Sequence, residues 1–226
     1  MISIIIPTYN EAENIGKIVT AIMNELSERN FELIIVDDDS PDGTWKIAKE
    51  LSKVYTNVRI IRRKNKRGLS SAVLEGFKNS RGEIIGVIDA DLSHPPELMK
   101  KMIDACKEND IVIASRYIKK GREKMSLFRR FVSKGATLMA RPLTKVNDPM
   151  SGYFFFKREI VKGVDLRPKG YKILLELLVK GKYEKCKEIH FIFGKRYHGK
   201  SKLGIKVYID YILHLIRLYA YKISRK

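Results

Sequence analysis

The stretch IIGVIDAD, residues 84–91, is the strongest indicator of fold in the chain. Its apolar half predicts a buried strand, and two carboxylates, Asp89 and Asp91, follow directly. An open α/β sheet binds its ligands beyond the carboxyl ends of such strands. Carboxylates spaced two residues apart can hold Mg²⁺ or Mn²⁺ against a diphosphate, because these ions take oxygen ligands and keep positions open for substrate and water. An isolated pair could equally be two solvated loop acids, so the surrounding segments decide.

The segments around this stretch repeat its pattern. Short apolar runs alternate with helical patterns, which predicts an α/β fold with a mostly parallel central sheet flanked by helices. Strands are expected at residues 2–6, 33–36, 58–61, 84–88, 111–114, 153–156 and 189–193.

The helices between these runs have recognisable starts. Asn10 is expected to cap the first helix, and the second follows Thr44 with Trp45 turned into the core. Proline favours a first helical turn, so another helix is expected at Pro95 and Pro96. Further helices are expected at residues 69–78 and 174–179.

Composition narrows the function classes. The chain has 226 residues and a formal charge of +19, an excess that indicates an anionic partner: nucleic acid, an acidic membrane surface or a phosphorylated substrate. No recognition helix, zinc finger or RNA-binding motif is present, which argues against nucleic acid. The two cysteines, Cys106 and Cys186, lie far apart in the sequence, so a reducing, cytoplasmic setting is expected. No apolar run approaches the ~18 to 20 residues of a membrane-spanning helix.

The last segment, residues 204–226, has an amphipathic pattern. Lys206, Asp210, His214 and Arg217 recur at helical spacing between apolar residues. Two interpretations stay open. The helix lies in a membrane interface with its cations on lipid headgroups, or it folds onto the domain.

Four loops are expected to meet at one sheet edge, because each follows a predicted strand. They are residues 7–11, 37–40, 63–68 and 89–91. Among Asp37, Asp38 and Asp39, at least one is expected to bind a base or ribose and another to cap the next helix. Tyr9 can offer its ring to a base. Together these loops predict a nucleotide pocket.

Four motifs in these loops, IIPTYNEAENI, IIVDDDSPDGT, RGLSSAVLEGF and VIDADLSHPPE, resemble the successive motifs of the inverting family 2 glycosyltransferases. Residues 115–117, 128–135, 148–152 and 199–203 resemble acceptor-side motifs of the branch that transfers mannose to dolichyl phosphate. The resemblance implies a GT-A type nucleotide-diphospho-sugar transferase fold over residues 1–203. Within it, residues 1–115 would form the nucleotide-sugar half and 116–203 the acceptor half.

The resemblance also assigns site residues. It implies a nucleoside pocket lined by Pro7, Tyr9, Glu11, Val36 and Asp38. It places Asp89, Ala90 and Asp91 against the sugar and diphosphate, with Asp91 the principal ligand of Mg²⁺ or Mn²⁺ and Asp89 and Ser93 beside it. It assigns the acceptor phosphate to Arg116, Arg129 and Ser133, and the donor diphosphate to Arg196 and Lys202. Asp89, Asp91, Arg116 and Arg129 would be the catalytic residues, whereas His94 is expected to support the site by hydrogen bonding.

The implied reaction is metal-dependent, inverting transfer of mannose from GDP-mannose to a dolichyl or other polyprenyl phosphate. It would take place at the cytoplasmic face of a membrane, and a small membrane subunit is a further candidate partner. A polyprenyl-phosphate glucosyltransferase that uses UDP-glucose is one alternative. A family 2 enzyme with a hydroxyl acceptor is another, and there Asp148 would serve as general base.

Overall fold

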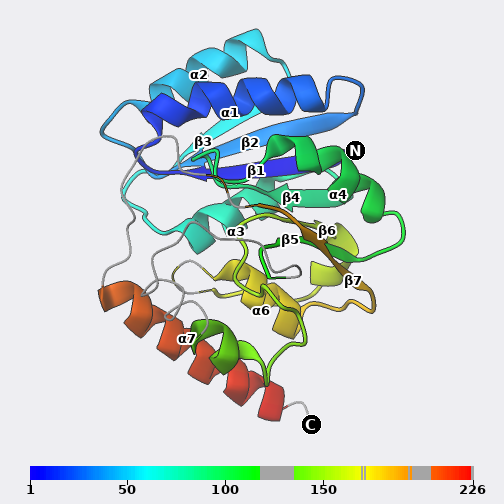
Figure 1. Cartoon of the computed structure of the whole chain (residues 1–226). Coiled ribbons are helices and arrows are strands. Elements are labelled where there is room, and N and C mark those ends of the chain that lie inside the picture. Colours follow the sequence, from blue (N-terminus) through cyan, green and yellow to red (C-terminus); the bar gives the residue numbers. More distant parts are fainter. Residues whose placement is uncertain (118–134, 169, 171, 193, 195–204, 225–226) are drawn as a thin grey trace.

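One sheet of seven strands organises the part of the chain that the computed structural model describes, residues 1–117, 135–168, 170, 172–192, 194 and 205–224 (Figure 1). The strand order is β3-β2-β1-β4-β6-β5-β7. The strands are β1 (Ile2–Thr8), β2 (Phe31–Asp37), β3 (Val58–Arg62), β4 (Ile84–Val87), β5 (Ile111–Ser115), β6 (Phe154–Lys157) and β7 (Cys186–His190).

The sheet is mostly parallel, as predicted. Strands β1, β2, β3 and β4 pair in parallel, and β7 pairs in parallel with β5. Strand β6 lies antiparallel between β4 and β5. The strand expected at residues 189–193 is β7, and it begins and ends earlier, because its register pairs Cys186 with Ile111 and His190 with Ser115.

Helices cover both faces of the sheet (Figure 1). Successive strand residues point to opposite faces, so Ile4 and Ile6 enter one apolar cluster and Ile5 the other. The first cluster packs under α1 (Ala12–Glu25), α2 (Thr44–Val54) and α4 (Met99–Ala105), and the second under α3 (Leu69–Asn79) and α6 (Ile173–Lys180). Short 3₁₀ turns, η1 (Pro96–Leu98) and η2 (Arg158–Val161), complete the elements before α7.

The start of α1 differs from the expectation for Asn10. The helix begins at Ala12, and Asn10 has a left-handed φ of 57° with no capping bond from its side chain. Asp42 instead accepts hydrogen bonds from the backbone of Ala12 (3.0 Å) and of Thr44 (3.0 Å), so one carboxylate serves the starts of α1 and α2. The prediction that one of Asp37 to Asp39 caps the second helix was wrong for the same reason.

Trp45 also differs from its prediction. It is partly buried rather than a core residue, and the Arg62 guanidinium lies 3.6 Å from its ring centroid. Arg62 also pairs with Asp39, so the aromatic ring, the guanidinium and the carboxylate connect the start of α2 to the ends of β2 and β3.

The last helix, α7 (Ile205–Ile223), packs beside α6 at the edge of the molecule (Figure 1). Its Tyr211, Leu215 and Leu218 join a third apolar cluster with residues of α6 and of the helical segment 135–140. The helix therefore folds onto the domain, which was one of the two expectations.

His214 and Arg217, two residues of the polar stripe of α7, face the domain. His214 is fully buried, and Arg217 donates to both carboxylate oxygens of Glu176 in α6 (3.2 and 3.4 Å). Lys222 donates to the backbone carbonyls of Pro142 and Leu143. In the membrane interpretation these two cations would lie on lipid headgroups, whereas in the structure they contact other parts of the chain.

Apolar side chains face outward from α7. Five of them are between 42% and 72% exposed: Ile209, Ile212, Leu213, Ile216 and Ile223. Among the described helices, none is both long enough and apolar enough to cross a membrane.

Candidate active site

The carboxyl ends of the first strands bring the predicted loops together at one edge of the sheet. β1 ends at Thr8, β2 at Asp37 and β3 at Arg62, and their parallel register places these three residues side by side. The segment after β4 carries the two carboxylates, and the Ile88 backbone extends the pairing by donating to Ile5. The convergence expected of the loops is confirmed.

Asp37 holds the first two loops in place. Its carboxylate is fully buried and accepts hydrogen bonds from the hydroxyls of Thr8 (2.8 Å) and Ser40 (2.6 Å) and from the Ser40 backbone (2.8 Å). The Ser40 hydroxyl in turn accepts from the Asn10 backbone (3.0 Å). Asp37 therefore holds the loops after β1 and β2 together, and its buried carboxylate is not exposed to a ligand.

Asp38 and Arg63 form a buried pair whose side chains are 5% and 3% exposed. Arg63 Nε donates to Asp38 (2.7 Å), and the other carboxylate oxygen accepts from the backbone of Gly68 (2.7 Å). Arg63 also donates to the Ser71 hydroxyl and the Gly68 carbonyl, which fixes the loop before α3. A charged pair buried this deeply is retained only with its hydrogen bonds satisfied, so Asp38 fixes the loop wall in addition to any contact with a nucleoside.

The remaining residues predicted for the nucleoside pocket lie around this wall. The Arg67 guanidinium lies 4.8 Å from the Tyr9 ring centroid, a cation–π contact that the sequence did not indicate. Pro7 and Val36 are register partners in β1 and β2, and both are buried, so their contact with a nucleoside stays a prediction. The Glu11 backbone donates to the Thr44 hydroxyl.

The two carboxylates after β4 differ in their surroundings. The Asp89 side chain is 31% exposed, whereas Asp91 is buried. Asp91 accepts from the hydroxyl (2.5 Å) and the backbone (3.1 Å) of Ser93 across a tight turn in which Leu92 has a φ of 58°. The Ser93 hydroxyl, expected beside the metal, therefore orients Asp91, and its role as a ligand stays a prediction.

Asp89 is held between two other segments. Nδ1 of the buried His94 lies 3.7 Å from its carboxylate, which is longer than a hydrogen bond, so the hydrogen-bonding role expected for His94 stays a prediction. A methyl group at Gly152 would come within 2.6 Å of Asp89 Oδ2, so the absence of a side chain there lets the loop before β6 approach the carboxylate. No motif or spacing in the sequence indicated this approach.

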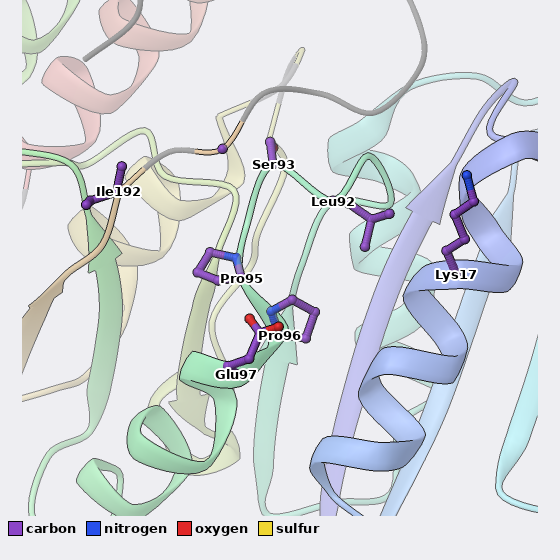
Figure 2. A pocket seen from close by; sticks show the side chains of 8 residues that line it. Lys17, Leu92, Ser93, Pro95, Pro96, Glu97 and Ile192 are labelled. Carbon is purple, nitrogen blue, oxygen red and sulfur yellow. The ribbon is translucent and has the colours of Figure 1, made fainter. Parts of the chain in front are cut away.

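A pocket of about 470 Å³ opens beside the same turn (Figure 2). Leu92 and Ser93 lie on its upper rim, and Lys17 of α1 faces Leu92 across it. Pro95, Pro96, Glu97, Ile192 and Gly194 complete its lining.

The donor set fits a divalent ion. Asp89 and Asp91 present hard oxygen ligands two residues apart, and no group of three or more His, Cys, Asp or Glu able to hold a metal occurs in the described ranges. Ions of this kind keep positions open for substrate oxygens and water, so Asp89 and Asp91 would hold such an ion and leave it accessible to a diphosphate.

Arg116, which follows β5, forms an ion pair held by two side-chain hydrogen bonds. Its Nε and one terminal nitrogen donate to the two oxygens of Asp148 at 2.8 and 2.9 Å, and its backbone donates to the same carboxylate at 3.2 Å. Asp148 is fully buried, so it is shielded from solvent and engaged on both oxygens.

Lys172, at the start of α6, adds a second cation that the sequence did not indicate. Burial lowers its pKa, and nearby Arg116 lowers it further, whereas Asp148 and Asp89 raise it. Arg116, on the acceptor side, and Asp89, on the metal side, are therefore both near enough to Lys172 for their charges to shift its pKa. Arg129, Ser133, Arg196 and Lys202, the other residues predicted to grip phosphates, lie outside the described residues.

A mostly parallel sheet with paired carboxylates after β4 and a fixed arginine after β5 defines the class of nucleotide-diphospho-sugar transferases with a GT-A type fold. Residues 3–164 match the model of glycosyl transferase family 2, and the chain belongs to this family.

Relatives and a solved structure agree with this assignment. A dolichol-phosphate mannosyltransferase of Pyrococcus furiosus is 48% identical over 96% of this chain, which spans 63% of that protein's length. One from Saccharomyces cerevisiae is 40% identical over 97% of this chain and 87% of its own. The structure of glucosyl-3-phosphoglycerate synthase from Mycobacterium tuberculosis with Mn²⁺, uridine diphosphate and phosphoglyceric acid has a TM-score of 0.66 at 19% identity, covering 98% of this chain and 78% of the other.

Proposed function

We propose that the protein transfers mannose from GDP-mannose to dolichyl or another polyprenyl phosphate, with inversion at the anomeric carbon and with a divalent metal bound by Asp89 and Asp91. The observation that carries the proposal is the joint placement of these carboxylates and the Arg116–Asp148 pair at one sheet edge. The names of two relatives at 40% identity or more support the choice of sugar and acceptor.

The donor side of the proposed reaction rests on the carboxylates. Ser93 holds Asp91 in orientation, His94 lies beside Asp89, and the Asp38–Arg63 pair fixes the neighbouring loop wall. A divalent ion, when bound, neutralises the charge that develops on the departing nucleoside diphosphate.

The acceptor side needs a cation rather than a base. A polyprenyl phosphate is already anionic near neutral pH, so its oxygen needs positioning against the sugar and no proton removal. Arg116 suits this task, since a guanidinium group makes paired hydrogen bonds to phosphate oxygens. A hydroxyl acceptor would need a carboxylate base, but Asp148 is buried and engaged on both oxygens, which disfavours that alternative.

We also propose peripheral association with the cytoplasmic face of a membrane through α7. The outward apolar stripe supports the membrane contact, and the two free cysteines support the reducing side. A small membrane subunit would use the same stripe.

Transfer of labelled sugar into the organic phase tests the reaction. GDP-mannose, GDP-glucose and UDP-glucose are supplied as donors, dolichyl phosphate and unphosphorylated dolichol as acceptors, each with Mn²⁺ or EDTA. Label carried from GDP-mannose to the phosphate alone, and lost with EDTA, is the expected result. Transfer from UDP-glucose would replace mannose with glucose, and transfer to dolichol would overturn the choice of acceptor.

A further inference from the structure

Asp148 is a fully buried carboxylate to which the proposed reaction gives no chemical task. It accepts three hydrogen bonds from Arg116, from Nε, from a terminal nitrogen and from the backbone. The Arg116 side chain is 16% exposed, so the arginine, unlike its partner, reaches the surface of the site.

The loop that carries Asp148 is itself anchored. Glu188 in β7 accepts hydrogen bonds from the backbone of Asp148 (3.0 Å) and from the backbone and side chain of Asn147 (2.9 and 2.8 Å). On the other side, the Ser151 hydroxyl donates to the Ala114 carbonyl in β5 (2.7 Å). The loop that carries Asp148 is therefore fixed to β7 on one side and to β5 on the other.

This arrangement determines the direction of the Arg116 guanidinium. The group is planar, and Asp148 engages the edge formed by Nε and one terminal nitrogen. The opposite edge then points away from Asp148. Lys172 lies in the same neighbourhood, because Arg116, Asp148 and Asp89 all shift its pKa.

We infer that Asp148 is a positioning residue, which holds Arg116 in the orientation that binds the acceptor phosphate. The inference rests on the proposed function, because it takes the acceptor to be a phosphate. Asp148 forms no bond with the substrate and moves no proton. Its contribution is to fix the arginine before the acceptor arrives, which removes an ordering cost from acceptor binding.

Asp148→Asn is the first test variant, because it preserves shape while replacing one charged acceptor oxygen with an amide donor that faces an Arg116 N–H. Farnesyl phosphate serves as a short, soluble acceptor. Its KM in mannosyl transfer and its dissociation constant in a binding titration are expected to rise at least about tenfold. The kcat, the KM for GDP-mannose and the shape of the pH–rate profile are expected to stay as in the wild type.

A double-mutant cycle with Arg116→Ala separates positioning from general destabilisation. If Asp148 acts through Arg116, then Asp148→Asn has little further effect on farnesyl phosphate binding once Arg116 is removed. Glu32→Gln is the matched control, since Glu32 is also a buried carboxylate that accepts from an arginine, Arg59 (2.6 Å), and from the backbone of Arg81. It lies near the start of β2, away from the site, and is expected to leave acceptor binding unchanged.

Three results would overturn the inference. A fall in kcat with loss of one limb of the pH–rate profile would make Asp148 a general base. An equal loss in both Arg116 backgrounds, or an equal loss in Glu32→Gln, would reduce Asp148 to a structural role. Failure of the wild type to bind farnesyl phosphate would remove the premise. The binding titration needs no turnover, so a wild type that binds farnesyl phosphate but transfers no mannose would reject the proposed donor or reaction and leave the inference standing.

Discussion

Gly152 shows how the size of one residue controls the position of a carboxylate. A Cβ there would lie 2.6 Å from Asp89 Oδ2, closer than real Cβ contacts come. The obstructing group is a side chain, so we expect Gly152→Ala to displace Asp89 more than to unfold the protein. A misplacement of about 1 Å can cost a rate on the order of 10²-fold, and we expect a loss of this order in mannosyl transfer.

Gly16→Ala is the control for that substitution. Gly16 lies within α1, and a Cβ there would meet no atom within 4 Å. Alanine is the better helix former by about 1 kcal/mol, so this variant is expected to keep its activity and gain stability. Thermal unfolding measures the stability of both variants, and the transfer assay measures their activity. A fully active Gly152→Ala would show that Asp89 tolerates the methyl group.

His214 gives the attachment of α7 a pH dependence. Burial lowers its pKa from 6.5 to about 4, Glu176 opposes this shift, and Arg217 and Lys180 add to it. The unfolded chain therefore binds a proton before the folded one does, and the stability present above pH 6.5 is lost as the pH falls toward 4. We expect a loss of about 2 kcal/mol in unfolding free energy between pH 7 and pH 5.

Denaturant titrations of the wild type and of His214→Gln at the two pH values measure this effect. Glutamine does not titrate, so the variant is expected to lose less stability on acidification, even if it is less stable at neutral pH. Equal pH dependence in both proteins would assign the effect to other groups.

The orientation of α7 determines which side of the helix can meet a lipid surface. Because Glu176 and the third apolar cluster hold one side, the exposed stripe containing Ile212 and Ile216 faces outward. We expect the double substitution Ile212→Glu and Ile216→Glu to abolish sedimentation with anionic vesicles, while mannosyl transfer to soluble farnesyl phosphate persists.

Val54→Glu is the control for the stripe. Val54 ends α2 and is 71% exposed, but α2 covers the opposite part of the molecule (Figure 1). Its substitution adds a negative charge without touching α7, so vesicle binding should survive. If both variants bind equally well, the stripe does not mediate the contact.

The charge of the whole molecule predicts how membrane binding depends on salt. With 45 Lys and Arg against 26 Asp and Glu, the chain should favour vesicles that contain phosphatidylglycerol over pure phosphatidylcholine. Raising the ionic strength to about 0.5 M shortens the screening length to a few ångströms and should weaken this binding. Flotation assays at two salt concentrations test it, and binding that is insensitive to both salt and lipid charge would leave only the apolar stripe as its cause.

The sequence predicted the strands of the nucleotide half because each one is a short apolar run followed by polar residues. It also predicted which loops would meet, since the ends of parallel strands share one sheet edge. The motifs in those loops were sufficient for the family. Errors arose where local patterns have several solutions: Asn10 could cap α1, but Asp42, distant along the chain, serves that helix start instead.

Local patterns also fail where a contact joins distant segments. No sequence spacing or composition predicts that Gly152 approaches Asp89 or that Glu188 anchors Asp148. The same holds for α7, because its amphipathic pattern specifies two faces and not which of them the domain covers. Buried Glu176 makes that choice by pairing with the polar face.

The sequence by itself therefore determined the sheet, the edge at which the loops converge and the identity of the carboxylates, because periodicity and motif order are properties of neighbouring residues. Only the tertiary structure decided that Asp38 holds Arg63, that Asp148 holds Arg116 and that Ile212 and Ile216 of α7 point outward. Each of these arrangements includes a buried charge whose partner is distant in the sequence. An unpaired charge destabilises the protein only where packing buries it, so the pairing is specified by the tertiary structure.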